Sequence, residues 1–78
     1  SNQQQSAKNR ALLLQQDLSS QLDEPVYAIS EPPFWKVRIG NFLTREEAND
    51  YRMTFVAQYP ELQGSTYVVP DKVIVINK

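Results

Sequence analysis

The strongest alternation of apolar and polar positions lies in residues 34–42, Phe-Trp-Lys-Val-Arg-Ile-Gly-Asn-Phe. Its first six residues repeat with a period of two, as expected of a strand with one buried face. The buried set is Trp35, Val37, Ile39 and the opposite set is Phe34, Lys36, Arg38. Gly40 and Asn41 then interrupt the pattern. The predicted strand therefore has one apolar face and one face with an aromatic ring and two cations.

Two amphipathic helices are predicted, one on each side of this strand in the sequence. The first covers about residues 6–22, where apolar residues recur at steps of three and four. Its stripe consists of Ala7, Ala11, Leu14, Leu18 and Leu22, widened by Leu12 and Leu13. The second covers about residues 45–59 and begins with a capping box, in which Thr44 is followed three residues later by Glu47. Its apolar side consists of Ala48, Tyr51, Phe55 and Tyr59, with Val56 beside them.

Three further apolar runs predict strands at residues 26–29, 65–69 and 73–76. The first run is joined to strand 34–42 by a short loop with two prolines, so these strands should pair as an antiparallel hairpin. Run 73–76 is either an extension of strand 65–69 or a fourth short strand. The order α-β-β-α-β, with this additional strand possible, predicts an α+β fold with an antiparallel sheet.

Length and composition limit the chain to one small globular domain. Of its 78 residues, 41% are hydrophobic and 22% are charged, which is typical of a folded chain rather than a disordered one. We expect the domain to cover residues 6–78, after a polar segment at residues 1–5 that is disordered or serves as a linker. No apolar run approaches the roughly 18 residues of a membrane span, and no signal peptide is recognised.

The residue content argues against an enzyme. The chain has no His and no Cys, which removes Ser-His-Asp and Cys-His catalysis and most zinc sites. Glu46 and Glu47 are adjacent on the second helix and point apart, so they cannot flank a substrate as glycosidase carboxylates do. Gly40 and Gly64 stand alone, so there is no glycine-rich phosphate loop. We expect no catalytic residues, no metal and no cofactor.

Phe34, Lys36 and Arg38 are the candidate binding residues. Sugar rings have flat C–H faces on which an aromatic ring can pack, and hydroxyl rims that Lys or Arg donors can reach. The three residues supply this set on one strand face. Alternating charges of this kind are more often a solvated face, so the pattern alone leaves both interpretations open. The pattern also leaves open which faces Tyr27 and Tyr67 occupy.

Trp35 has two interpretations. It is either a core residue under the helices, with its indole N–H bonded to a partner, or an aromatic platform for a ligand if the strand register slips by one residue. Its shared parity with Val37 and Ile39 favours the core.

Residues 34–48 resemble the SPOR domain, the sporulation-related repeat of bacterial envelope proteins. The resemblance is carried by Trp-Lys-Val-Arg-Ile-Gly-Asn-Phe at 35–42 and by Arg-Glu-Glu-Ala at 45–48. It implies a ferredoxin-like β-α-β-β-α-β fold, with two helices on one face of a four-stranded sheet. It also implies non-catalytic binding of peptidoglycan glycan strands, notably those without stem peptides, at the division site in the periplasm or cell envelope. On this resemblance, the exposed positions Phe34, Lys36 and Arg38 contact the glycan.

The sequence departs from the family layout at one point, because it starts at the first helix. The family's first strand is central in the sheet and contributes polar groups to the binding face, so the domain is expected to be truncated. A missing central strand would leave rows of unpaired backbone groups, and an open strand edge recruits another chain. We therefore predict a homodimer or a strand-exchanged oligomer. In it, strand 65–69 closes on strand 34–42, or run 73–76 adds to a neighbour's edge.

Two other classes of binding module remain open. Aromatic and basic residues on a sheet also occur in RNA-binding domains. A net charge of −1, a pI of about 5.2 and the single well-placed aromatic residue argue against nucleic acid as a partner. The other class is a module that recruits a protein through an exposed sheet edge or face. Binding to purified peptidoglycan sacculi, measured beside binding to a homopolymer RNA, separates these classes.

Overall fold

The computed structural model describes the backbone of residues 2–77 and the side chains of residues 5–76. Helices and strands follow one another along the chain in the predicted order, and the final apolar run is a separate fourth strand. The elements are α1 (Asn2–Gln21), β1 (Val26–Glu31), β2 (Phe34–Ile39), α2 (Arg45–Gln58), the 3-10 helix η1 (Pro60–Ser65), β3 (Thr66–Val68) and β4 (Val73–Asn77). The predicted α+β class is confirmed.

Several element boundaries differ from those predicted. Helix α1 begins at Asn2, so part of the segment assigned to linker or disorder is helical. Strand β2 ends at Ile39 rather than at residue 42, because Gly40 has a positive φ of 79° that leaves the extended conformation. The predicted loop after α2 is the helix η1, which begins with Pro60 and shortens β3 to three residues.

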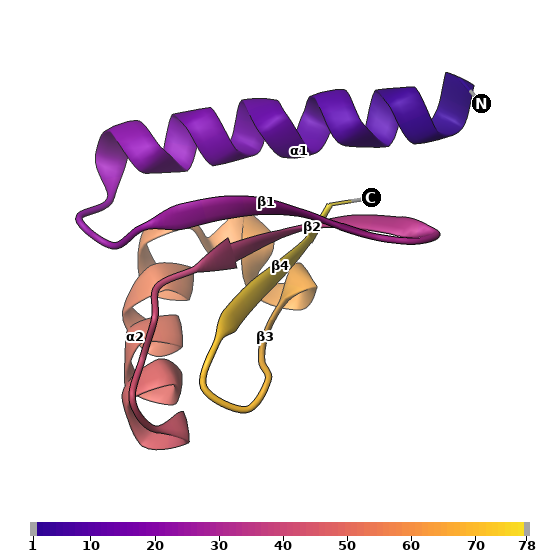
Figure 1. Cartoon of the computed structure of the whole chain (residues 1–78). Coiled ribbons are helices and arrows are strands. Elements are labelled where there is room, and N and C mark those ends of the chain that lie inside the picture. The colour runs from indigo at the N-terminus through magenta and orange to yellow at the C-terminus, as the bar shows by residue number, and fades with distance from the viewer. Residues whose placement is uncertain (1, 78) are drawn as a thin grey trace.

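The four strands form one antiparallel sheet in the order β1-β2-β4-β3. The predicted hairpin of β1 and β2 is present, and its turn contains a cis bond between Pro32 and Pro33. Figure 1 shows β4, in yellow, between β2 and β3, and it pairs with both. In the ferredoxin-like layout this central position belongs to the first strand. Here it is filled by the last strand of the described chain.

The position of β4 corrects the expectation of a gap in the sheet. Strand β2 is paired with β1 on one side and with β4 on the other, so its backbone groups have partners within the chain. Strand β4 likewise pairs with its own chain rather than with the edge of a neighbour. The unpaired strand edges that were the reason for predicting a dimer or a strand-exchanged oligomer are therefore absent between β2 and β3. The prediction of an oligomer itself is untested.

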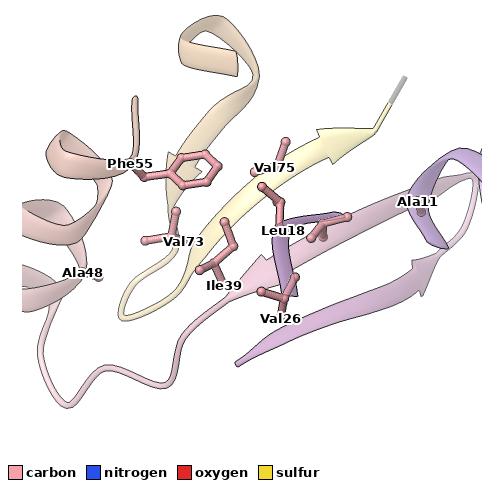
Figure 2. Packing of buried hydrophobic residues seen from close by; sticks show 9 residues of the cluster. Ala11, Leu18, Val26, Ile39, Ala48, Phe55, Val73 and Val75 are labelled. Carbon is pink, nitrogen blue, oxygen red and sulfur yellow. The ribbon is translucent and has the colours of Figure 1, made fainter. Parts of the chain in front are cut away.

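The hydrophobic core lies between the sheet and both helices, as Figure 2 shows. Helix α1 contributes Ala11 and Leu18, and α2 contributes Ala48 and Phe55, each at most 1% exposed. The sheet contributes side chains of one parity, namely Val26, Val37, Ile39, Val73 and Val75. Trp35 is packed against this cluster, which confirms its favoured interpretation. Both helices therefore cover the same face of the sheet.

Leu12 and Leu13 do not widen the buried stripe of α1, contrary to the prediction. Their exposed fractions are 37% and 66%, whereas Ala11 is fully buried. Successive helical residues are rotated by about 100°, which turns Leu13 to nearly the opposite side of the helix from the stripe through Ala11 and Leu18. Helix α1 thus packs on the sheet through one narrow stripe.

The predicted cap of α2 is present. The Glu47 N–H donates to Thr44 Oγ1 at 3.1 Å, and Thr44 has the extended backbone of an N-cap residue. The Glu47 carboxylate accepts in turn from the Leu43 N–H at 3.4 Å, one residue earlier than in the usual capping box. The loop from β2 is thereby tied to the first turn of the helix.

We expect Gly40→Ala to destabilise the fold by roughly 1–3 kcal/mol. A side chain at a positive φ is strained, and a Cβ at Gly40 would lie 2.5 Å from two ring carbons of Phe42. Urea denaturation of both proteins measures the difference. Gly64→Ala is the matched control, because φ at Gly64 is not positive and a Cβ there meets no atom within 4 Å. Equal stability of the two variants would contradict the assigned role of Gly40.

Two further substitutions compare the cap with the core. Thr44→Ala removes one hydrogen bond and should cost about 1 kcal/mol. Ile39 is fully buried, so Ile39→Ala leaves a cavity in the core and should lower the free energy of unfolding by roughly 2–5 kcal/mol. Thermal and denaturant unfolding of the two variants test this ranking, and equally mild effects would refute the burial assigned to Ile39.

Candidate functional site

The face of the sheet turned away from the core, here called the open face, carries the opposite parity of each strand. Its side chains are Tyr27, Ile29 and Glu31 of β1, Phe34, Lys36 and Arg38 of β2, Tyr67 of β3, and Ile74 and Ile76 of β4. All three predicted binding residues lie on this face. The register also resolves the two tyrosines that the sequence left open, since both lie on the open face.

One row of this face crosses all four strands. The strand register aligns Tyr27 with Arg38, Arg38 with Ile74, and Ile74 with Tyr67. Neighbouring strands are about 4.8 Å apart, so the backbones of the two tyrosines are separated by roughly 14 Å. An aromatic side chain thus stands at each end of the row, with a cation and an aliphatic side chain between them.

Arg38 is held in place by neutral groups. Its guanidinium carbon lies 5.0 Å from the centroid of the Tyr27 ring, a cation–π distance. Its Nε donates to the Gly40 carbonyl at 3.5 Å, and its Nη2 donates to the Asn41 Oδ1. The Asn41 amide nitrogen donates to the Tyr27 hydroxyl at 2.8 Å, which closes the network. These contacts fix the guanidinium without neutralising its charge.

Lys36 is held by a second aromatic residue and by an acid. Its ammonium lies 5.8 Å from the centroid of the Tyr67 ring and 3.3 Å from a carboxylate oxygen of Glu31. The Tyr67 hydroxyl, followed by Glu31, raises the pKa of Lys36 above its ordinary value of 10.5, while burial acts in the opposite direction. Glu31 is 65% exposed, so this ion pair positions Lys36 more than it stabilises the fold.

A groove of about 420 Å³ lies on the open face between these groups. Its lining residues are Ile29, Glu31, Lys36, Arg38, Tyr67, Val69, Pro70, Lys72 and Ile74. Ile74 is only 8% exposed although it belongs to the open face, because neighbouring side chains cover it. The groove therefore has an aliphatic floor and charged and phenolic walls, and it offers both apolar contact and hydrogen-bond donors.

The predicted residues occupy different parts of this surface. Lys36 and Arg38 line the groove, whereas Phe34 lies at the β1–β2 hairpin end, 54% exposed, beside a small cavity lined with Pro32 and Pro33. Trp35 lies on the core side of the sheet, where the Lys8 ammonium is 6.0 Å from its ring centroid. The structure thus brings two of the three predicted residues together and places the third farther along the same strand.

The sequence analysis missed the contribution of β3, β4 and the turn between them. Tyr67, Lys72 and Ile74 line the groove, but their shared face depends on a pairing between segments that no local pattern reveals. It also missed Arg52, whose Nε donates to the Thr66 carbonyl at 2.8 Å and joins α2 to the start of β3. The apolar residues at 73–76 were an available signal for a strand there, but not for the strands with which it pairs.

The described residues offer no metal centre. No group of three or more His, Cys, Asp or Glu side chains in that part of the chain is placed to hold a metal ion. No helix within residues 2–77 is long and apolar enough to cross a membrane. The open face carries cations, a carboxylate, aromatic rings and aliphatic side chains.

The fold and the open face define a small α+β binding domain with a grooved sheet surface. A family model, the SPOR domain, matches residues 3–62, and the chain belongs to that family. SPOR domains are peptidoglycan-binding modules of division proteins, and they occur in envelope or periplasmic proteins. The match ends within η1, so β3 and β4 lie outside it. Comparisons with curated proteins and with solved structures give no significant match.

We expect Tyr67→Phe to lower the pKa of Lys36 toward 10.5, because the hydroxyl that favours the ammonium is removed. The charged form is favoured in the folded state, so its contribution to stability is complete below pH 10.5 and is lost as the pH rises through the folded pKa. A titration of the lysine side-chain NMR signals measures the change. Glu31→Gln should give a smaller shift in the same direction, and an unchanged pKa in Tyr67→Phe would exclude the hydroxyl as the main cause.

Proposed function

We propose that this chain binds peptidoglycan glycan strands, without catalysis, through the open face of its sheet. The observation that carries the proposal is the pairing of two aromatic residues with cations, Tyr27 with Arg38 and Tyr67 with Lys36, around the aliphatic side chain of Ile74. Membership of the SPOR family supports the same ligand class. The site would comprise these four residues and Phe34.

The chemistry of a glycan strand suits this surface. Sugar rings offer flat C–H faces to aromatic and aliphatic side chains and hydroxyl or amide oxygens to donors. Tyr27 and Phe34 are 40% and 54% exposed, so their rings are accessible to such a ligand. A glycan strand that crosses the sheet along the row from Tyr27 to Tyr67 would contact both aromatic–cation pairs at once. This arrangement favours a ligand longer than a single sugar ring.

The proposed cellular context follows from the ligand. A domain that binds glycan strands acts where they are exposed, in the periplasm or cell envelope, and we propose that it localises its protein to the division site. The resemblance to SPOR domains implies that glycan strands stripped of stem peptides are the preferred form. Nucleic acid is not expected as a partner, since the chain has a net charge of −1.

A pull-down on purified sacculi tests the proposal. We expect the unmodified chain to sediment with sacculi, and the triple variant Phe34→Ala, Lys36→Ala, Arg38→Ala to bind at least about tenfold more weakly, because an aromatic surface and two donors are lost. Its circular dichroism spectrum should stay unchanged. Homopolymer RNA, tested in parallel, should not be retained.

The control for this prediction removes similar exposed side chains outside the open face. Leu43, Arg45 and Met53 lie in or just before α2 and are exposed, Leu43 to 87% and Met53 to 67%. Replacing these three by Ala should leave binding to sacculi intact. Unaltered binding by the open-face variant would move the site elsewhere, and equal losses in both variants would point to nonspecific adhesion.

A further inference from the structure

The groove concentrates positive charge in a chain that is acidic as a whole. Its walls carry three cations, Lys36, Arg38 and Lys72, and one carboxylate, Glu31, which is a formal charge of +2. The complete chain has a formal charge of −1. A local excess of this kind raises the concentration of anions at the groove even though the protein as a whole does not attract them.

Within the described part of the chain, only one of these three cations has an acidic partner. Among the described residues, Lys36 is paired with Glu31, and no ion pair is formed by Arg38 or Lys72. The partners of Arg38 are a carbonyl, an amide oxygen and the Tyr27 ring, all neutral, and its Nη1 has no protein acceptor in the described chain. Arg38 and Lys72 therefore keep their charge and free donors for a ligand.

The two unpaired cations lie at the same end of the groove. The Arg38 guanidinium extends along the strand toward Gly40, because its Nε bonds the Gly40 carbonyl. The β2–β4 ladder ends with the pair Ile39 and Val73, so Gly40, which follows Ile39, and Lys72, which precedes Val73, lie at the same end of the ladder. Both cations line the groove. A guanidinium fork beside an ammonium matches the oxygens of a carboxylate or phosphate.

We propose that Arg38 and Lys72 form an anion subsite that recognises a negatively charged group of the wall glycan. This inference rests on the proposed function and specifies the chemical group of the ligand that the groove recognises. Because Lys72 lies outside the matched residues 3–62, the subsite depends on the C-terminal hairpin of this chain. The anion can be a carboxylate on the sugars or a phosphate of a polymer linked to them, and both present oxygens to the same donors.

Soluble glycan strands with blocked or free anions test the subsite. Binding of the whole chain is measured by calorimetry to untreated strands, to strands whose carboxylates are converted to methylamides, and to strands freed of phosphodiester-linked polymers by hydrofluoric acid. We expect one of the two treatments to weaken binding about tenfold, which identifies the group as carboxylate or phosphate. In Lys72→Gln and in Arg38→Gln the untreated and treated strands should bind alike.

The variants also report on charge and geometry. Lys72→Gln and Arg38→Gln should reduce the dependence of binding on salt, whereas Arg45→Gln removes the same charge from an exposed position of α2 and should leave it unchanged. Arg38→Lys should restore part of the preference for the charged strand, because it restores the charge without the fork. Equal binding of all strands by the unmodified chain would overturn the anion subsite alone. Absence of binding to every strand would overturn the proposed function as well.

Discussion

The pairing of β4 between β2 and β3 is the interaction on which the rest of the structure depends. It satisfies the backbone of two neighbouring strands and so converts a hairpin and a three-residue strand into one sheet. The side chains of β4 alternate between the core face and the open face of the sheet. Val73 and Val75 enter the core under the helices, while Ile74 and Ile76 lie on the open face. The core and the floor of the groove are therefore built by one strand.

The open face is organised by cations that are held by aromatic rings. The rings of Tyr27 and Tyr67 belong to the two outer strands, and the cations that they hold belong to β2. Any shift of β4 would change the separation of Tyr67 and Lys36, because β4 lies between their strands. The geometry of the candidate site is thus a consequence of the sheet order. The ion pair with the exposed Glu31 carboxylate orients the Lys36 ammonium and adds little to the stability of the fold.

Sequence patterns predicted the parts of this structure that are governed by neighbours along the chain. The alternation around Val37 and the cap at Thr44 act within a few residues, and both are present. The central position of β4 could not be predicted in the same way, because pairing between distant segments depends on the whole topology. One signal was available: four consecutive apolar residues at 73–76 predict a strand that is apolar on both faces, and such a strand is less suited to the exposed edge of a sheet than to its middle. The faces of Tyr27 and Tyr67 depended on the same pairing.

The family match and the groove of the open face overlap only in part. The SPOR match covers α1, β1, β2 and α2, which contain Lys36, Arg38 and most of the helical core. The groove is completed by Tyr67, Lys72 and Ile74, all beyond the match. The middle of the family's binding face is polar where its first strand passes, whereas here Ile74 and Ile76 occupy it. An aliphatic floor cannot accept or donate hydrogen bonds, so the polar groups of this surface are confined to the groove walls.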